Sequence, residues 1–254
     1  MGITAQPCEL GAVLGLRDMY RLEMSCQIIH DSIHSRLGWT QEYSLRIDGI
    51  QVGYGSLAIG GPWSETPALY EFFVADPYRV RVFELFGALR KASAARRMET
   101  QSNDALTTVM LQTYAVNVVT ESILFRDEVA TRLAPIDAKF RIATMEDGLD
   151  ISAQQLPWHG VVEVDGVVAA TGGILFHYNR PYGDIYMEVR EEFRGRGLGG
   201  FIVQELKRVC YKGGFKPGAR CNPKNIPSQR TLQRAGFVPC GNILVGDLPP
   251  IENG

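Results

Sequence analysis

Long apolar runs, paired cysteines and compositionally biased segments are all missing from this sequence. No run of about 18 apolar residues occurs, and the first residues carry no basic charge, so we expect neither a membrane span nor a signal peptide. The 27 glycines and 13 prolines follow no period. The 254 residues, of 45% hydrophobic composition, suffice for one large core or two ordinary ones, so we expect a globular protein. Because we expect neither a membrane span nor a signal peptide, we also expect a cytoplasmic location and no membrane partner.

The cysteines are few and form no recognisable pattern. Five is an odd number, and no two of them form a CxxC pair. A disulfide framework would show an even number at short spacings, and a zinc site would show paired cysteines. We therefore expect reduced cysteines, mostly in the core, and no metal.

Charge is unevenly distributed, although the net charge is only −2. Residues 190–234 hold eleven Lys or Arg and three Glu, a balance of +8, and the rest of the chain carries −10. A solvated helix face would give the same balance, but such a field also attracts nucleic acid or a multiply phosphorylated small molecule. Few aromatic residues accompany the basic ones and the whole chain is acidic, so we expect the small molecule and no nucleic acid.

An internal repeat divides the chain into two halves of similar pattern. Each half has an Asp-Gly between alternating apolar residues, which is typical of a tight hairpin turn. Three anchors recur in the same order at offsets of 117, 115 and 120 residues: Asp48-Gly49 with Asp165-Gly166, 70–74 with 185–189, and 122–125 with 242–245. We therefore predict two copies of one α/β unit, in domains 1–130 and 131–254, with a linker near 127–137 that contains Pro135.

Hydrophobic periodicity places the elements of both copies. In the first copy we expect helices near 17–36, 79–95 and 103–114. In the second copy we expect two helices, near 198–213 and 226–235, and six strands, near 139–144, 158–164, 167–176, 183–189, 217–221 and 238–245.

A glycine-rich loop lies between an expected strand and an expected helix, over Arg194-Gly195-Arg196-Gly197-Leu198-Gly199-Gly200. Its glycines let the backbone approach a ligand, and the following helix N-terminus directs free N–H groups at the same point. The loop fits neither a P-loop nor a dinucleotide fingerprint, since the region about 20 residues later is basic where a Rossmann unit has an acidic residue. The sequence therefore predicts an anion site at this loop.

Three segments resemble the GNAT superfamily of acyl-CoA-dependent N-acyltransferases. Arg194-x-x-Gly197-x-Gly199 is similar to the family's pyrophosphate loop, five residues after a strand valine. Asn225-Ile-Pro-Ser228 with Gly236-Phe237 is similar to its second signature, and 140–147 resembles the start of such domains. The resemblance implies an α/β (α+β) fold of two tandem GNAT-like domains, each a mixed, mostly antiparallel sheet flanked by helices.

The resemblance also implies acetyl-CoA (coenzyme A) as co-substrate. In the family, the strand before the loop separates from its neighbour, and the pantetheine arm lies in the gap. Asn225 is in addition a natural helix N-cap, and the two roles are compatible. Carried over, the residues that hold the cofactor are Met187, Val189, Arg194, Gly195, Arg196, Gly197, Leu198, Gly199, Gly200, Asn225 and Ser228.

Candidate catalytic side chains lie on the strand before the loop. Apolar residues alternate with Asp184, Tyr186 and Glu188, so one face is core and the other faces the acceptor. Amine acetylation needs a base, for which Glu188 is the first choice and Asp184 the second; a solvated edge or a salt bridge is the structural alternative. Tyr186 either binds the acceptor or packs as an ordinary strand residue.

Several departures from the family pattern stand out. Leu232 occupies the place where many members carry a tyrosine that acts as general acid. The first two strands of the second copy are separated by only about 14 residues, whereas the family usually has two helices between them. In the first copy, Arg79-Val-Arg-Val82-Phe-Glu84 replaces the loop, with valine and glutamate at its two key glycines. We expect this degenerate copy to be structural or to bind substrate.

The most favoured function is therefore an N-acetyltransferase that transfers an acetyl group to a primary amine of a small molecule or peptide by direct attack in a ternary complex. The alternative is an acyl-CoA-binding sensor or regulatory module without turnover, which the missing tyrosine favours. The sequence assigns neither the acceptor, the acyl chain length nor an oligomeric state.

Overall fold

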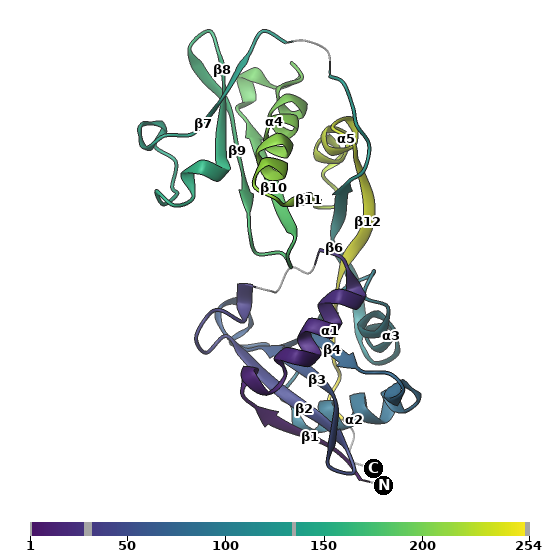
Figure 1. The fold of residues 1–254 in the computed structure, drawn as a ribbon. Helices are drawn as coiled ribbons and strands as arrows, with labels where there is room; N and C mark the ends of the chain where they lie inside the picture. Colours follow the sequence, from purple (N-terminus) through teal and green to yellow (C-terminus); the bar gives the residue numbers. More distant parts are fainter. Residues whose placement is uncertain (1, 28–31, 134–135, 252–254) are drawn as a thin grey trace. The chain divides into compact units, whose positions relative to one another are not determined.

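The chain folds into two compact units in the computed structural model, which describes residues 2–27, 32–133 and 136–251. Unit 1 consists of Met1–Glu121 and Gly241–Gly254, and unit 2 of Ser122–Cys240 (Figure 1). The expected linker residue Pro135 lies outside the described residues. Within those residues, no helix combines the length and apolar composition needed to cross a membrane.

Unit 1 is a mixed sheet with helices. Its strand order is β1-β2-β3-β4-β5-β12, in which all neighbours are antiparallel except the parallel pair β4–β5. The elements that begin in this unit are β1 (Ile3–Cys8), α1 (Leu14–Met24), β2 (Thr40–Ile47), β3 (Ile50–Ala58), β4 (Ala68–Val74), α2 (Val82–Ala92), β5 (Arg97–Gln101), α3 (Ala105–Tyr114) and β6 (Val116–Asp127).

Unit 2 repeats this arrangement in the strand order β7-β8-β9-β10-β11-β6, and its one parallel pair is β10–β11. Its elements are β7 (Lys139–Ile142), β8 (His159–Val164), β9 (Val167–Leu175), β10 (Tyr182–Val189), α4 (Leu198–Lys212), β11 (Lys216–Cys221), α5 (Ile226–Arg234) and the start of β12 (Phe237–Asp247). The predicted tandem α/β architecture is confirmed.

The two hairpin turns explain why the repeat is visible in the sequence. Asp48 and Gly49 have φ angles of 49° and 83°, and Asp165 and Gly166 have 50° and 77°. Two successive residues with positive φ define the type I′ turn, which Asp-Gly adopts readily and which matches the twist of the strands. The turns therefore set the register of β2–β3 and of β8–β9 in the same way.

Each unit takes its sixth strand from the other half of the repeat. In unit 1 this strand is the end of β12, whose Ile243–Asp247 pair with Gln101–Arg97 of β5. In unit 2 it is the end of β6, whose Ile123–Arg126 pair with Cys221–Gly218 of β11. The two end strands are therefore exchanged between the copies, which the periodicity of the sequence does not reveal.

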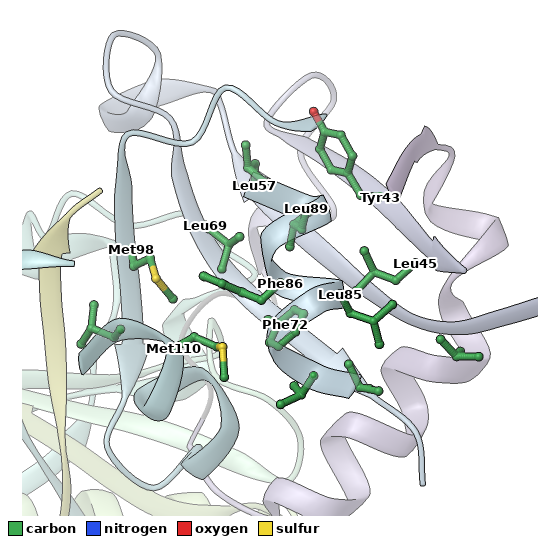
Figure 2. Close-up of a cluster of buried hydrophobic side chains, with 14 of the residues drawn as sticks. Tyr43, Leu45, Leu57, Leu69, Phe72, Leu85, Phe86, Leu89, Met98 and Met110 are labelled. Carbon is green, nitrogen blue, oxygen red and sulfur yellow. The ribbon is translucent and has the colours of Figure 1, made fainter. Parts of the chain in front are cut away.

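Each unit has its own hydrophobic core. In unit 1, one face of the sheet packs against α2 and α3, with Phe72 and Leu69 of β4 opposite Leu85 and Phe86 of α2 (Figure 2). In unit 2, apolar residues of β9 and β10 pack against α4, with Leu206 fully buried. Burial on this scale is the main stabilising contribution to each unit.

The first-copy helices differ from their expected ranges. The expected helix near 17–36 ends at Met24, because Ser25 adopts a left-handed conformation with φ 41°; residues 28–31 lie outside the described residues. The expected helix near 79–95 begins at Val82, after the short 3-10 helix η4 (Tyr78–Arg81). The expected helix near 103–114 is α3, with Asp104 as N-cap.

Candidate active site

Strands β10 and β11 separate within unit 2. Their parallel pairing ends at Asp184↔Gly218, although β10 stays paired with β9 as far as Val189↔Ala170. On its other edge, β11 stays paired with β6 as far as Cys221↔Ile123. From residue 185 onward, the edge of β10 that faces β11 therefore has no partner strand.

The backbone groups on this edge can be assigned from one hydrogen bond. The N–H of Arg190 donates to the carbonyl of Ala169, at 3.0 Å, so Arg190 directs its backbone toward β9. Because alternate residues of a strand direct their backbone groups to opposite edges, Met187 and Val189 present theirs to the unpaired edge. These are the two strand residues that the resemblance assigns to the pantetheine arm.

The glycine loop follows this edge directly, after the short helix η7 (Glu191–Phe193). Gly195 and Gly197 have φ angles of 78° and 82°, a region that L side chains enter only at a cost. Gly197 is the N-cap of α4, whose first N–H groups, those of residues 198–200, have no acceptor within the helix. Glycine is thus required here by the backbone itself, and the loop ends on a helix N-terminus.

Gly199 and Gly200 have a different reason to be glycine, because side chains crowd them. A Cβ at Gly199 would lie 3.2 Å from Thr231 of α5 and 3.5 Å from Met187, and one at Gly200 would lie 3.3 Å from Leu133. Leu198 is buried in the core of unit 2. These small residues therefore let Thr231 of α5 and Leu133 pack closely against the first turn of α4.

Two arginines supply positive charge at the loop. Arg194 donates from Nε to the carbonyl of Val189, at 3.2 Å, and Arg196 donates from Nη2 to the carbonyl of Glu192, also at 3.2 Å. Both residues are exposed, and in the described part of the chain neither guanidinium forms an ion pair. Their charge is thus available to an anionic ligand.

The start of α5 is capped by a side chain. Asn225 accepts a hydrogen bond from the N–H of Ser228, at 3.1 Å, so its predicted capping role is confirmed. Burial raises the pKa of the Cys221 thiol, although a hydrogen bond from Ser228 opposes this. Since a thiol must ionise to attack, Cys221 is a poor nucleophile. Leu232 is buried in the core.

The face of the sheet that the resemblance assigns to the acceptor is the one opposite α4, and it is called the acceptor face here. Met187 and Val189 point toward α4, because both lie within 3.6 Å of the position of a Cβ on Gly199. Tyr186 and Glu188 therefore point to the other face, where Glu188 is exposed and Tyr186 is 41% exposed. Burial raises the pKa of the Tyr186 hydroxyl.

The second carboxylate on this face, that of Asp184, is buried and engaged. It accepts a hydrogen bond from Nε2 of His177, at 2.8 Å, and lies 3.5 Å from Nε of Arg220. The Asp184 side chain is only 5% exposed. The two carboxylates thus differ sharply: Glu188 is open to a ligand, and Asp184 holds two neighbouring side chains in place.

His159 also lies beneath the acceptor face. Its Nδ1 is 2.7 Å from the carbonyl of Gln155, and its ring lies over Gly173, where a Cβ would come within 2.3 Å of it. The ring contacts Tyr186 edge-on, with centroids 5.8 Å apart. Because Gly173 lies between these two residues in the register, its missing side chain lets them meet across three strands.

The wall of the acceptor side is short, as the sequence predicts. Between β7 and β8 the structure has two single-turn 3-10 helices, η5 (Met145–Asp147) and η6 (Leu156–Trp158), in place of longer helices. Arg141 anchors η5 through a bidentate ion pair with Asp147. Residues 144–158 therefore contribute no α-helix to unit 2.

Sequence reasoning undervalued one residue of this site. It counted Arg220 only as part of the basic stretch, whereas the structure places it beside the separating strands and against Asp184. The sequence does contain a signal, namely opposite charges at Arg220 on β11 and Asp184 on β10. To recognise that these two residues meet, one must know the parallel register of the strands, which the local sequence pattern does not give.

Comparison with known proteins agrees with this geometry. Residues 128–237 match the Acetyltransferase (GNAT) family. An acetyltransferase of the GNAT family from Colwellia psychrerythraea has 14% identity, covers 97% of this chain and 100% of its own, and superposes with a TM-score of 0.75. No curated protein is significantly similar in sequence.

Two further solved structures share the architecture of the whole chain. A GCN5-related N-acetyltransferase from Sphaerobacter thermophilus has 14% identity and a TM-score of 0.61, with 98% of this chain and 97% of that chain covered. A tandem GNAT protein from the clavulanic acid biosynthesis pathway has 13% identity and a TM-score of 0.60, with 99% and 100% covered. At such identities the likeness shows the fold alone.

The chain thus has the tandem GNAT fold, and within it residues 128–237 are similar to the GNAT acetyltransferase family. The family match and the fold support acyl transfer as the general class of reaction.

Proposed function

We propose that unit 2 is an acetyl-CoA-dependent N-acetyltransferase that acts on a primary amine. The observation that carries the proposal is the unpaired edge of β10, which begins after Asp184 and leads directly into the glycine loop at the start of α4. A strand edge with free amide groups pairs with an extended ligand, and a helix N-terminus with arginines binds phosphate. Acetyl-CoA combines both features in one molecule.

The chain's own residues fit this co-substrate. Met187 and Val189 offer backbone donors and acceptors to the pantetheine amides, and the loop from Arg194 to Gly200 holds the pyrophosphate. Asn225 and Ser228, at the start of α5, line the far side of the gap. The bound co-substrate supplies the activated acetyl group.

Glu188 is the proposed general base. It takes a proton from the acceptor ammonium, so that the neutral nitrogen forms the new C–N bond. As the C–S bond breaks, the second proton of that nitrogen passes through water to the departing thiolate. Its exposure on the acceptor face, next to the unpaired edge, allows contact with an incoming amine. Tyr186 contributes the adjoining surface that binds the acceptor.

Unit 1 is proposed to be a structural partner without cofactor. The functional division into domains 1–130 and 131–254 follows from this assignment, with the end strands exchanged as described. A cytoplasmic location fits an odd number of cysteines without a CxxC pair, since disulfide frameworks belong to oxidising compartments.

The test is a search for N-acetylated product. Purified protein is incubated with acetyl-CoA and a panel of primary amines, and the products are identified by mass spectrometry. Product from at least one amine, reduced by Glu188→Gln, supports the proposal. Tight acetyl-CoA binding with no product from any amine would instead favour a non-catalytic acyl-CoA sensor, the function that the buried Leu232 in place of a tyrosine favours.

A further inference from the structure

We infer that Arg220 selects the acceptor, and that the acceptor is an amine which carries a carboxylate. This inference rests on the proposed function and deepens it, because it names a substrate class for the same site. It arises from the position of Arg220, from the way Asp184 holds it, and from its relation to Glu188.

The register places Arg220 on the acceptor face. Asp184 pairs with Gly218 in the parallel ladder, so Arg220, two residues later, faces the same side as Asp184 and Tyr186. The contact of 3.5 Å between Nε of Arg220 and the Asp184 carboxylate agrees with this direction. Arg220 therefore lies where the strands have begun to separate, on the side from which the acceptor enters.

The contact of Arg220 with Asp184 is made through Nε, at 3.5 Å. The Asp184 carboxylate is itself fixed by His177, at 2.8 Å, and is nearly fully buried. The Arg220 side chain is 38% exposed, and among the described residues no other carboxylate lies within ion-pair distance of it. Within the described ranges, neither Nη1 nor Nη2 of Arg220 donates a hydrogen bond, so both are available to a ligand in the planar fork that matches a carboxylate.

Glu188 completes a pair of opposite charges on one face. It lies two residues beyond Tyr186, or about 7 Å along the strand, and Arg220 lies level with Tyr186 on the other side of the gap. An ammonium at Glu188 and a carboxylate at Arg220 would be joined by a short linker. The face is therefore complementary to a small zwitterion such as an amino acid.

The cofactor phosphates do not account for Arg220. The glycine loop begins after Val189, at the far end of the unpaired edge, where Arg194 and Arg196 already supply charge. A phosphate role for Arg220 would nevertheless be detected, because its removal would then weaken acetyl-CoA binding.

The experiment compares matched acceptors that differ in one charge. Glycine, β-alanine and γ-aminobutyrate are each compared with their carboxamides as acceptors, by the release of CoA thiol, for wild type, Arg220→Gln and Arg208→Gln. Arg208 is an exposed arginine of α4 and serves as the control for loss of charge. Binding of the same compounds to the protein–CoA complex is measured by calorimetry.

We expect wild type and Arg208→Gln to favour at least one carboxylate over its amide by about 10- to 100-fold in kcat/KM, and Arg220→Gln to lose this preference through KM. Unchanged preference in Arg220→Gln, equal use of acids and amides by wild type, or a raised acetyl-CoA KM in Arg220→Gln would each overturn the inference. If no amine is acetylated, the proposed function fails. In that case the calorimetry tests the inference separately, and equal affinity of wild type and Arg220→Gln for the carboxylates would overturn it.

Discussion

The two units place an arginine at the same point of the repeat, yet its surroundings differ. In unit 2, Arg194 donates to the carbonyl of Val189 and keeps its charge free of ion pairs among the described residues. In unit 1, Arg79 donates to the carbonyl of Val74, at 2.7 Å, but also binds Glu23 and lies 3.7 Å from Asp76. The two arginines thus share a local geometry, but the charge of Arg194 is available to an anion and the charge of Arg79 is neutralised by carboxylates.

The gap between the parallel strands shows the same contrast. Pairing of β4 with β5 ends at Leu69↔Met98, so these strands separate as β10 and β11 do. In unit 1, however, the hydroxyl of Thr107 donates to the carbonyl of Phe72, at 3.3 Å. Phe72 is the counterpart of Met187 in the repeat, so the backbone group that would meet a ligand is already bonded.

Helix α1 closes unit 1 further. Tyr20 donates to Asp104, the N-cap of α3, at 2.8 Å, and Arg17 forms an ion pair with the fully buried Glu71 of β4. Asp104 is the counterpart of Asn225. The position that corresponds to the proposed cofactor site is therefore occupied by hydrogen-bonded side chains in unit 1 and lined by glycines in unit 2.

The largest expected effect comes from the buried ion pair of unit 1. Burial alone raises the pKa of Glu71, but Arg17 and His34 outweigh it and hold this pKa well below its usual value. Arg17→Met leaves the carboxylate unbalanced and should lower the free energy of unfolding by about 3–5 kcal/mol. Urea denaturation, followed by the fluorescence of Trp39 and Trp63, measures this loss.

A surface arginine provides the control for this variant. Arg81, whose side chain is 23% exposed, forms an ion pair with the exposed Glu84 on the same unit, so Arg81→Met should change the unfolding midpoint less than Arg17→Met. Equal shifts for both variants would show that the buried network does not stabilise unit 1 in particular.

Removal of the proposed base should affect only the chemical step. Glu188→Gln keeps the shape of the side chain but cannot take a proton, so kcat should fall about 100-fold or more with acetyl-CoA affinity unchanged. Glu205→Gln, on α4, is the matched control. A kcat close to that of wild type would remove Glu188 from the mechanism.

A charged side chain in the glycine loop should weaken cofactor binding. Gly197→Glu adds a Cβ at a φ of 82° and a negative charge at the phosphate position, so acetyl-CoA affinity should fall about 100-fold. In unit 1, Gly87→Glu makes the same change where a Cβ meets no atom within 4 Å, and affinity should not change. Thermal unfolding of both variants separates lost binding from lost folding.

The smallest effect is a pH dependence of unit 1. Burial opposes protonation of His34, but its hydrogen bonds with Glu42 and Glu71 outweigh burial and raise its pKa. The charged ring therefore stabilises the fold below about pH 6.5, and this contribution is lost as the pH rises through the folded-state pKa. The stability advantage of wild type over His34→Gln should therefore shrink between pH 6 and 8, which urea denaturation at both pH values measures. An advantage that grows over this range would contradict the assignment.

Local pattern predicted most of unit 2. Its elements lie within two residues of their expected ranges, since Asp-Gly turns, alternating apolar residues and the cap at Asn225 all act over short distances. The exchange of β6 and β12 escaped prediction, because either strand has the right apolar pattern for either sheet. The burial of Asp184 also escaped, because alternation gives the face of a residue but not the partners that cover it.

The central claim is that the glycine loop makes unit 2, and not unit 1, the site of acetyl-CoA binding. Its most direct test is the stoichiometry of a calorimetric titration of acetyl-CoA into the wild-type chain. The account predicts one molecule bound per chain, and none after Gly197→Glu. The account would be contradicted if two acetyl-CoA molecules bound per chain, if none bound to the wild type, or if one still bound after Gly197→Glu.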